Sequence, residues 1–295
     1  MSLRFYPVAS ADGTRLNAWT NDADGPTVLL CNGLGTNAYA WPALLDDACT
    51  VRVVSWNHRG VGGSERPADP SRVGVDAFVE DALAVLDDAG IESCPVVGWS
   101  IGVNTQFELA TLFPERVTGM FCVAGVPGGT FASMLAPLMV PRFARRALTI
   151  NVARSLRAVG KVVSPISTRM PIGSASARML RHSGFMTRRA DNDVVRTALT
   201  EFMTTDVDWY MHLAVAAAEH PRVTLTGIHV PTAFVAGRYD VLASARDMAA
   251  AAQQIERATY TELPGSHFVQ MEHPDLVHAE LLHLLTRVAH AERRP

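Results

Sequence analysis

A serine, an aspartate and a histidine occur in this sequence in an order that suits nucleophilic catalysis. Ser100 is the centre of the pentapeptide Gly98-Trp99-Ser100-Ile101-Gly102, and Asp240 and His267 follow later in the chain. A serine hydroxyl is a weak nucleophile at neutral pH, so it needs a base to take its proton and a carboxylate to orient that base. Ser100 is therefore the candidate nucleophile, His267 the candidate base and Asp240 the candidate orienting acid.

The pentapeptide lies between two segments that would hold Ser100 in place. Pro95-Val96-Val97 is a short apolar run that predicts a strand, and residues 101–113 have the spacing of a helix. A nucleophile at a tight strand-to-helix turn has a strained backbone, and Gly98 and Gly102 leave room for that turn. The simpler alternative is a glycine-bounded loop that carries a solvated serine.

Asp240 and His267 each follow a predicted strand. Asp240 comes after the apolar run 232–236 through a three-residue link, and His267 comes after the run 258–263 through Pro264-Gly265-Ser266. Catalytic groups of open α/β sheets gather at the carboxyl ends of the strands. The three side chains are therefore expected to converge, although they are far apart in the sequence.

Other residues compete for these roles. His58 also follows a predicted strand and is the reserve candidate for the base. Asp247 lies at least one helical turn beyond Asp240 and is expected to face away from the site. The plainer interpretations are that Asp240 only caps a loop and that His267 is a structural histidine.

Acyl transfer also needs hydrogen-bond donors for the oxyanion of the tetrahedral intermediate. The backbone N–H of Ile101, next after Ser100 and near a helix N-terminus, is one candidate. The second is the N–H of Leu34 in the loop Asn32-Gly33-Leu34-Gly35, which follows the predicted strand 27–31. An ordinary glycine-rich turn is the alternative for this loop.

The rest of the chain alternates between strand-like and helix-like segments. Residues 4–9 and 14–20 predict a hairpin with a turn at Asp12-Gly13. Further strands are predicted at 51–56 and 117–124, and helices at 39–46, 73–89, 243–254 and 274–290. This alternation predicts an α/β fold with a mostly parallel central sheet and helices on both faces.

The alternation is interrupted between residues 127 and 227. This stretch has helical segments but no convincing strand, so we predict one core domain, residues 1–126 and 228–295, with a helical insertion at 127–227. The insertion contains 13 Arg or Lys and 6 Asp or Glu, whereas the whole chain has a net charge of −3. A basic insertion favours an anionic substrate or contact with a lipid surface, unless its arginines simply solvate the outer faces of helices.

Composition narrows the class of protein. The chain has 295 residues and 48% hydrophobic residues, which suits a globular enzyme. Its charge gives no reason to expect a nucleic-acid partner, and no signal peptide or membrane-spanning segment is visible, so a cytoplasmic location is expected. Buried, reduced thiols are predicted for the four cysteines, and neither a metal nor an organic cofactor is expected. The cysteines are Cys31, Cys49, Cys94 and Cys122.

Outside the insertion the chain resembles the α/β-hydrolase superfamily. The resemblance rests on the Ser100 pentapeptide, on Gly237-Arg238-Tyr239-Asp240 and on Gly265-Ser266-His267-Phe268. It also includes residues 57–64, a segment that in relatives shapes the floor of the active site. The resemblance implies an α/β-hydrolase fold in which the insertion is a cap over the pocket.

The chain departs from the family pattern at two asparagines. Asn57 replaces the usual aspartate, and Asn32 stands where many relatives have histidine before the oxyanion glycine. An asparagine side chain is still able to brace the oxyanion loop. The run Asn32-Gly33-Leu34-Gly35-Thr36 is similar to enol-lactone hydrolases of aromatic catabolism.

These observations predict a serine hydrolase that cleaves carboxylic esters of short to medium acyl chains through an acyl-enzyme. The alternatives are an enol-lactone or carbon–carbon bond hydrolase, a cofactor-free perhydrolase, and a ligand receptor with a slow triad. The expected partner is a small ester or lactone. An apolar pocket is expected from Trp99, Phe131, Met134, Leu135, Met139 and Phe268, although methionines more often fill a helical core.

Overall fold

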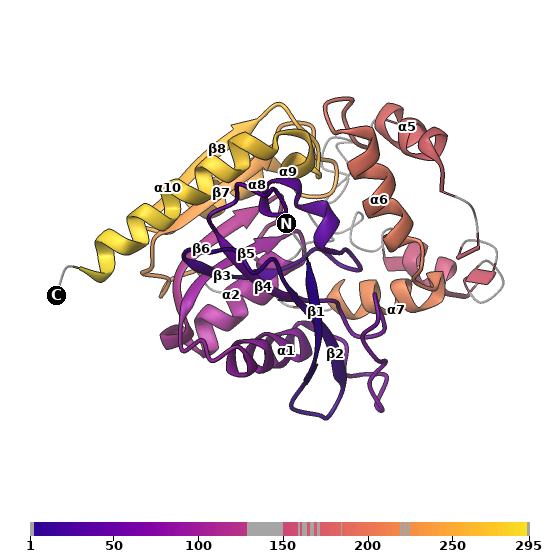
Figure 1. The fold of residues 1–295 in the computed structure, drawn as a ribbon, viewed down its shortest axis with the longest axis horizontal. Coiled ribbons are helices and arrows are strands. Elements are labelled where there is room, and N and C mark those ends of the chain that lie inside the picture. Colours follow the sequence, from indigo (N-terminus) through magenta and orange to yellow (C-terminus); the bar gives the residue numbers. More distant parts are fainter. Residues whose placement is uncertain are drawn as a thin grey trace.

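A central sheet of eight strands organises the protein. The structure is a computed structural model that describes residues 3–128, 150–158, 160, 164–165, 168–169, 172–183, 185–218, 220, 223 and 225–293. The strands are ordered β1-β2-β4-β3-β5-β6-β7-β8 (Figure 1). β1 pairs with β2 and β2 with β4 in antiparallel fashion, and all other neighbours are parallel. The predicted α/β class with a mostly parallel sheet is confirmed.

The strands match the predicted apolar runs closely. Residues on either side of the Asp12-Gly13 turn form the predicted hairpin, and Gly13 has φ +81° there. Because the inner parallel strands are buried on both faces, their sequences are nearly continuous apolar runs, whereas the parallel edge strand at residues 258–263 is only partly buried. The bounds are β1 Arg4–Ala9, β2 Arg15–Thr20, β3 Thr27–Cys31, β4 Arg52–Trp56, β5 Cys94–Trp99, β6 Val117–Val123, β7 Thr232–Gly237 and β8 Ala258–Leu263.

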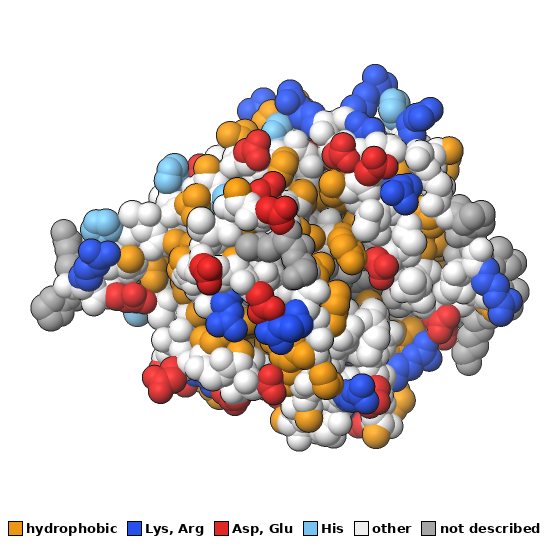
Figure 2. Space-filling view, in the orientation of Figure 1, with side chains coloured by type: hydrophobic (Ala, Val, Ile, Leu, Met, Phe, Trp, Pro, Cys, Tyr) orange, Lys and Arg blue, Asp and Glu red, His pale blue; other side chains and the backbone are white. Residues whose placement is uncertain are grey.

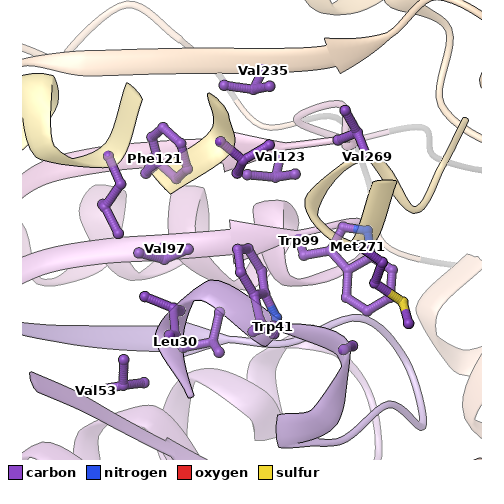
Figure 3. Packing of buried hydrophobic residues seen from close by; sticks show 14 of the residues in the cluster. Leu30, Trp41, Val53, Val97, Trp99, Phe121, Val123, Val235, Val269 and Met271 are labelled. Carbon is purple, nitrogen blue, oxygen red and sulfur yellow. The ribbon is translucent and has the colours of Figure 1, made fainter. Parts of the chain in front are cut away.

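Helices cover both faces of the sheet and form two hydrophobic cores. Helices α1 (Val75–Asp88), α2 (Gly102–Leu112) and α8 (Ala245–Ala252) pack on one face, where they meet side chains such as Met120 and Cys122. The other face packs against α9 (Val269–Glu272) and α10 (Pro274–Glu292). Figure 3 shows this second core, with Phe121 and Val123 of β6 turned to the face opposite to Met120.

One predicted helix is replaced by two short turns. The expected helix at residues 39–46 is instead a pair of 3-10 turns, Ala38–Ala40 and Pro42–Leu44. The prediction was wrong because Pro42 has no N–H to donate and its ring excludes a regular helix interior. Trp41, between the two turns, is buried in the second core. The two turns therefore act as a short cover for this face of the sheet.

The described residues between β6 and β7 include three labelled helices. They are α5 (Ser174–His182), α6 (Asn192–Phe202) and α7 (Val207–Ala218), and residues 150–158 are also helical. Asp191 begins α6 by accepting hydrogen bonds from the N–H groups of Asp193 and Val194. Figure 1 shows the three helices gathered on one side of the molecule, away from the far end of α10. Within the described part of 127–227 no residue is in a strand.

Helix α7 is fixed to the core by Trp209. Its indole Nε1 donates to the carbonyl oxygen of Arg59 at 2.8 Å, and the Arg66 guanidinium lies 4.5 Å from the ring centroid. Arg66 also pairs with Asp206 at 2.6 Å. One edge of this helical group therefore has a polar and aromatic attachment to the loop after β4.

The surface of these helices carries cationic side chains. Figure 2 shows arginine side chains gathered along the upper edge, over α5, where Arg178 is exposed. All four cysteines are buried and unpaired. Among the described residues, no helix is both long enough and apolar enough to cross a bilayer.

Candidate active site

Ser100 occupies a strained turn between β5 and α2. Its φ is +57°, a conformation that residues with a Cβ rarely adopt. The turn needs glycines on both sides: a Cβ at Gly102 would clash with the carbonyl oxygen of Cys31, and one at Gly98 would clash with the side chain of Gln106. The two glycines therefore allow β5 and α2 to approach their neighbours closely at this turn. The side chain of Ser100, at the centre of the turn, projects away from the sheet.

The structure brings the hydroxyl of Ser100, the imidazole of His267 and the carboxyl group of Asp240 together. His267 Nε2 lies 2.9 Å from Ser100 Oγ, and His267 Nδ1 lies 2.8 Å from Asp240 Oδ2. A carboxylate only accepts hydrogen bonds, so Nδ1 carries the proton and Nε2 is left to accept from the serine hydroxyl. Asp240 and His267 are buried, with 4% and 5% of their surfaces exposed.

Asp240 is held by the backbone of its own loop. Its Oδ1 accepts from the N–H groups of Leu242 at 2.7 Å and Ala243 at 2.8 Å, so only Oδ2 faces the imidazole. This arrangement fixes which carboxyl oxygen meets His267. Asp247, the rejected competitor, lies in α8 and does not border the cavity described below.

Trp99 connects the nucleophile to the histidine loop. Its Nε1 donates to the carbonyl oxygen of His267 at 3.0 Å, and its ring packs edge-on against Phe268 and Trp41. Only 1% of the Trp99 surface is exposed. The residue before Ser100 therefore sets the position of the backbone that carries His267.

The structure adds Glu272, which sequence analysis missed, to the surroundings of His267. Its carboxyl oxygens accept hydrogen bonds from the Ser266 N–H at 2.6 Å, the Ser266 hydroxyl at 2.7 Å and the Thr187 N–H at 2.6 Å. Glu272 is 4% exposed. A single buried carboxyl group therefore ties the loop before His267 to the chain between α5 and α6. An acidic residue one short helix after the histidine was the only signal of this in the sequence.

We expect Glu272→Gln to weaken the position of His267. The amide loses one acceptor and places an N–H donor against groups that also donate, which costs about 2 kcal/mol of unfolding free energy. Urea unfolding measures this loss, and kcat is expected to fall more than KM changes. Glu262→Gln is the control, because Glu262 makes its contacts at the surface, an ion pair with Arg238 and a hydrogen bond from the Tyr260 hydroxyl. A Glu272→Gln protein with parental stability and kcat contradicts this role.

Two backbone N–H groups border the same space as Ser100. Those of Leu34 and Ile101 donate no hydrogen bond to any described residue, and both residues line the cavity. Asn32 braces the loop that carries Leu34: its Oδ1 accepts from the Gly33 N–H and from Trp41 Nε1, and its Nδ2 donates to the carbonyl oxygen of Asn37. The predicted oxyanion donors therefore have free N–H groups and a rigid support.

A cavity of about 480 Å³ opens over Ser100. Its described walls are almost entirely apolar, and among them no Lys, Arg, Asp or Glu is present. Core residues such as Trp99, Phe268 and Met271 form one wall. The rest of the described wall comes mainly from residues 150–158, from α5, α6 and α7, and from the link between α5 and α6. It includes Leu180, Met186, Val195, Leu199, Phe202, Tyr210 and Met211.

The pocket residues were only partly predicted. Trp99 and Phe268 line the cavity as expected. The expected pocket residues Phe131, Met134, Leu135 and Met139 lie outside the described residues. The wall from α6 was missed, although Val195, Leu199 and Phe202 recur at helical spacing. That spacing indicates an apolar helix face, but a helix that packs against a filled hydrophobic core has the same spacing.

His58, the reserve candidate for the base, does not border the cavity. Its ring is 3% exposed and packs edge-on against Phe78, with 4.6 Å between ring centroids. Burial lowers the pKa of His58 to about 4, because the protonated ring has lost its solvation. His58 therefore supports the fold as a neutral side chain.

The pKa of His58 predicts a loss of stability in mild acid. The unfolded chain takes up a proton near pH 6.5, whereas the folded protein resists protonation until about pH 4. Stability from this group is therefore present at pH 7 and lost as the pH falls, by about 2 kcal/mol at pH 5. Urea unfolding at pH 7 and pH 5 measures this, and His58→Gln should remove that part of the pH dependence. Equal pH dependence in both proteins would refute the assignment.

The segment 57–64 does not floor the cavity, contrary to what the resemblance implied. None of its residues borders the cavity as described. Arg59 is fully buried and pairs with Asp81 at 2.7 Å, while its carbonyl oxygen receives the Trp209 indole. The segment therefore joins the hairpin, α1 and α7.

Within the described residues no group of three or more His, Cys, Asp or Glu is placed to hold a metal ion.

Comparisons with known proteins agree with this architecture. Residues 26–274 match the family model described as alpha/beta hydrolase fold. The chain is 26% identical over 275 residues, 92% of each chain, to 3-oxoadipate enol-lactonase 2 of Acinetobacter baylyi. It is 37% identical to the putative carbamate hydrolase RutD of Caulobacter segnis, but over only 100 residues, 33% of this chain and 37% of that protein.

A solved structure supports the fold over the full length. A thermophilic esterase from Thermogutta terrifontis superposes with a TM-score of 0.73, and the match covers 97% of this chain and 99% of that chain. The two sequences are 20% identical, so the likeness concerns the fold alone.

Proposed function

Because the chain belongs to the α/β hydrolase fold family, we propose that it is a serine hydrolase that cleaves neutral carboxylic esters through an acyl-enzyme. The observation that carries this proposal is the chain of two hydrogen bonds from Ser100 through His267 to Asp240. At the Ser100 end of these two hydrogen bonds, the serine hydroxyl faces an apolar cavity.

In the first half of the reaction Ser100 Oγ attacks the ester carbonyl. His267 Nε2 takes the hydroxyl proton, and Asp240 stabilises the resulting imidazolium through Nδ1. The negative charge that develops on the carbonyl oxygen is held by the N–H groups of Leu34 and Ile101. His267 then gives the proton to the departing alkoxide, which leaves as the alcohol.

In the second half a water molecule replaces the alcohol. His267 Nε2 takes a proton from this water, whose oxygen attacks the acyl carbonyl, and the same two N–H groups hold the second oxyanion. Collapse returns the proton to Ser100 Oγ and releases the carboxylic acid.

The cavity supports an uncharged acyl or alcohol group. Its described walls carry no cation that would pair with a carboxylate on the substrate. Burying an unpaired charge in this cavity would cost far more free energy than the burial of methylene groups contributes. Helices α5, α6 and α7 act in this proposal as a cap that supplies most of the apolar contacts.

A panel of uncharged esters tests the proposal. We expect ethyl esters of short and medium chain acids to be hydrolysed with a maximum in kcat/KM at a medium length, because each methylene adds to burial until the cavity is filled. A fluorophosphonate probe should label Ser100 in the folded protein. No labelling and no turnover would favour a ligand receptor, whereas a maximum only at long chains with activation at a lipid interface would favour a lipase.

Enol-lactone hydrolysis is the second candidate. The similarity over 92% of the Acinetobacter enol-lactonase favours it, because a lactone is an internal ester that the same triad opens. The described cavity walls restrict this candidate to uncharged lactones. A faster rate on an uncharged enol lactone than on any open-chain ester would select it.

A further inference from the structure

The polar side chains in the cavity wall are few, and nearly all of them have a structural partner. Besides Ser100 and His267, four described wall residues carry polar side-chain atoms. They are Thr36, Asn37, Trp99 and Tyr210.

Three of these four are engaged. The Thr36 hydroxyl donates to the Gly33 carbonyl oxygen at 2.6 Å, and Trp99 Nε1 donates to that of His267. Asn37 donates to the Ala198 carbonyl oxygen at 3.2 Å and accepts from the Tyr39 N–H at 3.1 Å. These groups hold the oxyanion loop, the histidine loop and α6 in place, so they are not available to a substrate.

The Tyr210 hydroxyl is different. It makes no hydrogen bond with any described residue, although the backbone N–H of Tyr210 continues the ladder of α7. Burial raises the pKa of Tyr210 to about 12, so the phenol is protonated at neutral pH and is able to donate. The other polar side chains of the described wall, Ser100 and His267 apart, already have partners, and no described wall residue accepts from this hydroxyl.

The ring of Tyr210 is fixed beside the oxyanion loop. It packs edge-on against Phe202, with 5.1 Å between ring centroids. A Cβ on Gly35 would come within 2.8 Å of the Tyr210 ring, so the ring lies directly on the residue that follows Leu34. Gly35 itself has φ +67°. The loop thus passes close to the Tyr210 ring, and Tyr210 lines the cavity beside the loop that carries Leu34, a proposed oxyanion donor.

We infer that Tyr210 is a specificity-determining residue whose hydroxyl donates a hydrogen bond to a second acceptor on the substrate, within a few bonds of the scissile carbonyl. The substrate class is an uncharged ester that carries a ketone, ether or hydroxyl oxygen in addition to the ester group. A hydroxyl left unpaired in an apolar site has a desolvation cost, which such an oxygen removes and a plain hydrocarbon chain does not. This inference rests on the proposed function.

Matched esters test it. Ethyl heptanoate is compared with ethyl oxoheptanoates that carry the ketone at successive chain positions, and with heptanoates of keto alcohols. For the parent protein we expect at least one ketone ester to exceed its hydrocarbon counterpart about tenfold in kcat/KM, the size of one hydrogen bond. Tyr210→Phe should abolish this preference, because its kcat/KM for the favoured ketone ester should fall about tenfold relative to its kcat/KM for ethyl heptanoate.

The intrinsic reactivity of an ester is the same for the parent protein and for Tyr210→Phe. The ratio of their kcat/KM values on one ester therefore reports the effect of the Tyr210 hydroxyl. Tyr6→Phe removes the same atom from β1, away from the cavity, and should keep the preference. The inference is wrong if the parent shows no preference, or if Tyr210→Phe retains it.

Binding separates a failure of this inference from a failure of the proposed function. Calorimetry with Ser100→Ala measures the Kd of the same ketone and hydrocarbon esters without turnover. If the parent hydrolyses none of the esters, the proposed function fails, yet a ketone preference in Ser100→Ala that disappears in Ser100→Ala/Tyr210→Phe still supports Tyr210. Equal Kd values in these two proteins, or no binding at all, overturn the inference.

Discussion

Replacing Ser100 with alanine is expected to lower kcat by about a million-fold on the best ester of the panel. The hydroxyl is the only group at the site that both opens into the cavity and lies within 2.9 Å of His267 Nε2 among the described residues. Residual turnover would come from the oxyanion donors and from binding alone. Steady-state kinetics with purified protein measure the loss, and labelling by a fluorophosphonate should disappear with it.

The stability of the variants should show that the loss of kcat comes from the chemical step and not from unfolding. Ser71→Ala, at an exposed serine whose hydroxyl bonds Asp69, should keep full activity. Ser100→Ala keeps the strained φ of +57° and should unfold like the parent, whereas Ser100→Gly releases about 1 kcal/mol of strain and should be more stable. Activity above one per cent in Ser100→Ala would assign the nucleophile to another residue.

Asp240→Asn is expected to lower kcat by about ten-thousand-fold while KM changes little. The cause lies in the loop of Asp240. Because the N–H groups of Leu242 and Ala243 both point at one carboxyl oxygen, the amide oxygen of asparagine would take that place. The amide NH₂ would then face His267 Nδ1 and donate to it. The imidazole would carry its proton on Nε2, where it cannot accept the proton of Ser100.

This explanation has a matched control in the same segment. Asp247→Asn changes a carboxyl group in α8 that does not border the cavity and should leave kcat unchanged. Asp240→Ala should retain more activity than Asp240→Asn, since it removes the carboxylate without imposing the wrong tautomer. Parental activity in Asp240→Asn would exclude Asp240 as the orienting acid and leave the contact at 2.8 Å as a structural one.

The two effects differ in size because the residues act at different points. In the proposed mechanism Ser100 forms the covalent bond, whereas Asp240 only orients and stabilises the imidazole, so part of the rate should survive the loss of Asp240. Glu272 lies one step further away. It acts through Ser266 and the backbone before His267, and its removal is expected to cost stability and a smaller part of kcat.

The elements around the triad were predictable from local patterns. Short apolar runs followed by helical spacing predicted the β5–turn–α2 unit at Ser100, and the structure has β5 at Cys94–Trp99 and α2 at Gly102–Leu112. The convergence of Asp240 and His267 was predictable because parallel strands end at one edge of the sheet. The helix expected at 39–46 is absent, because Pro42 has no N–H to donate and two 3-10 turns form there instead.

The sequence by itself determined the order of the strands and most helices of the core along the chain, and it singled out Ser100, Asp240 and His267, because period and turn residues are local properties. Only the tertiary structure decided what surrounds them. Glu272, Tyr210 and the apolar face of α6 have ordinary sequence patterns, and their roles depend on which residues they meet across the fold. An apolar helical face looks the same in sequence whether it fills a core or borders an empty space, since packing partners are set by contacts between distant segments.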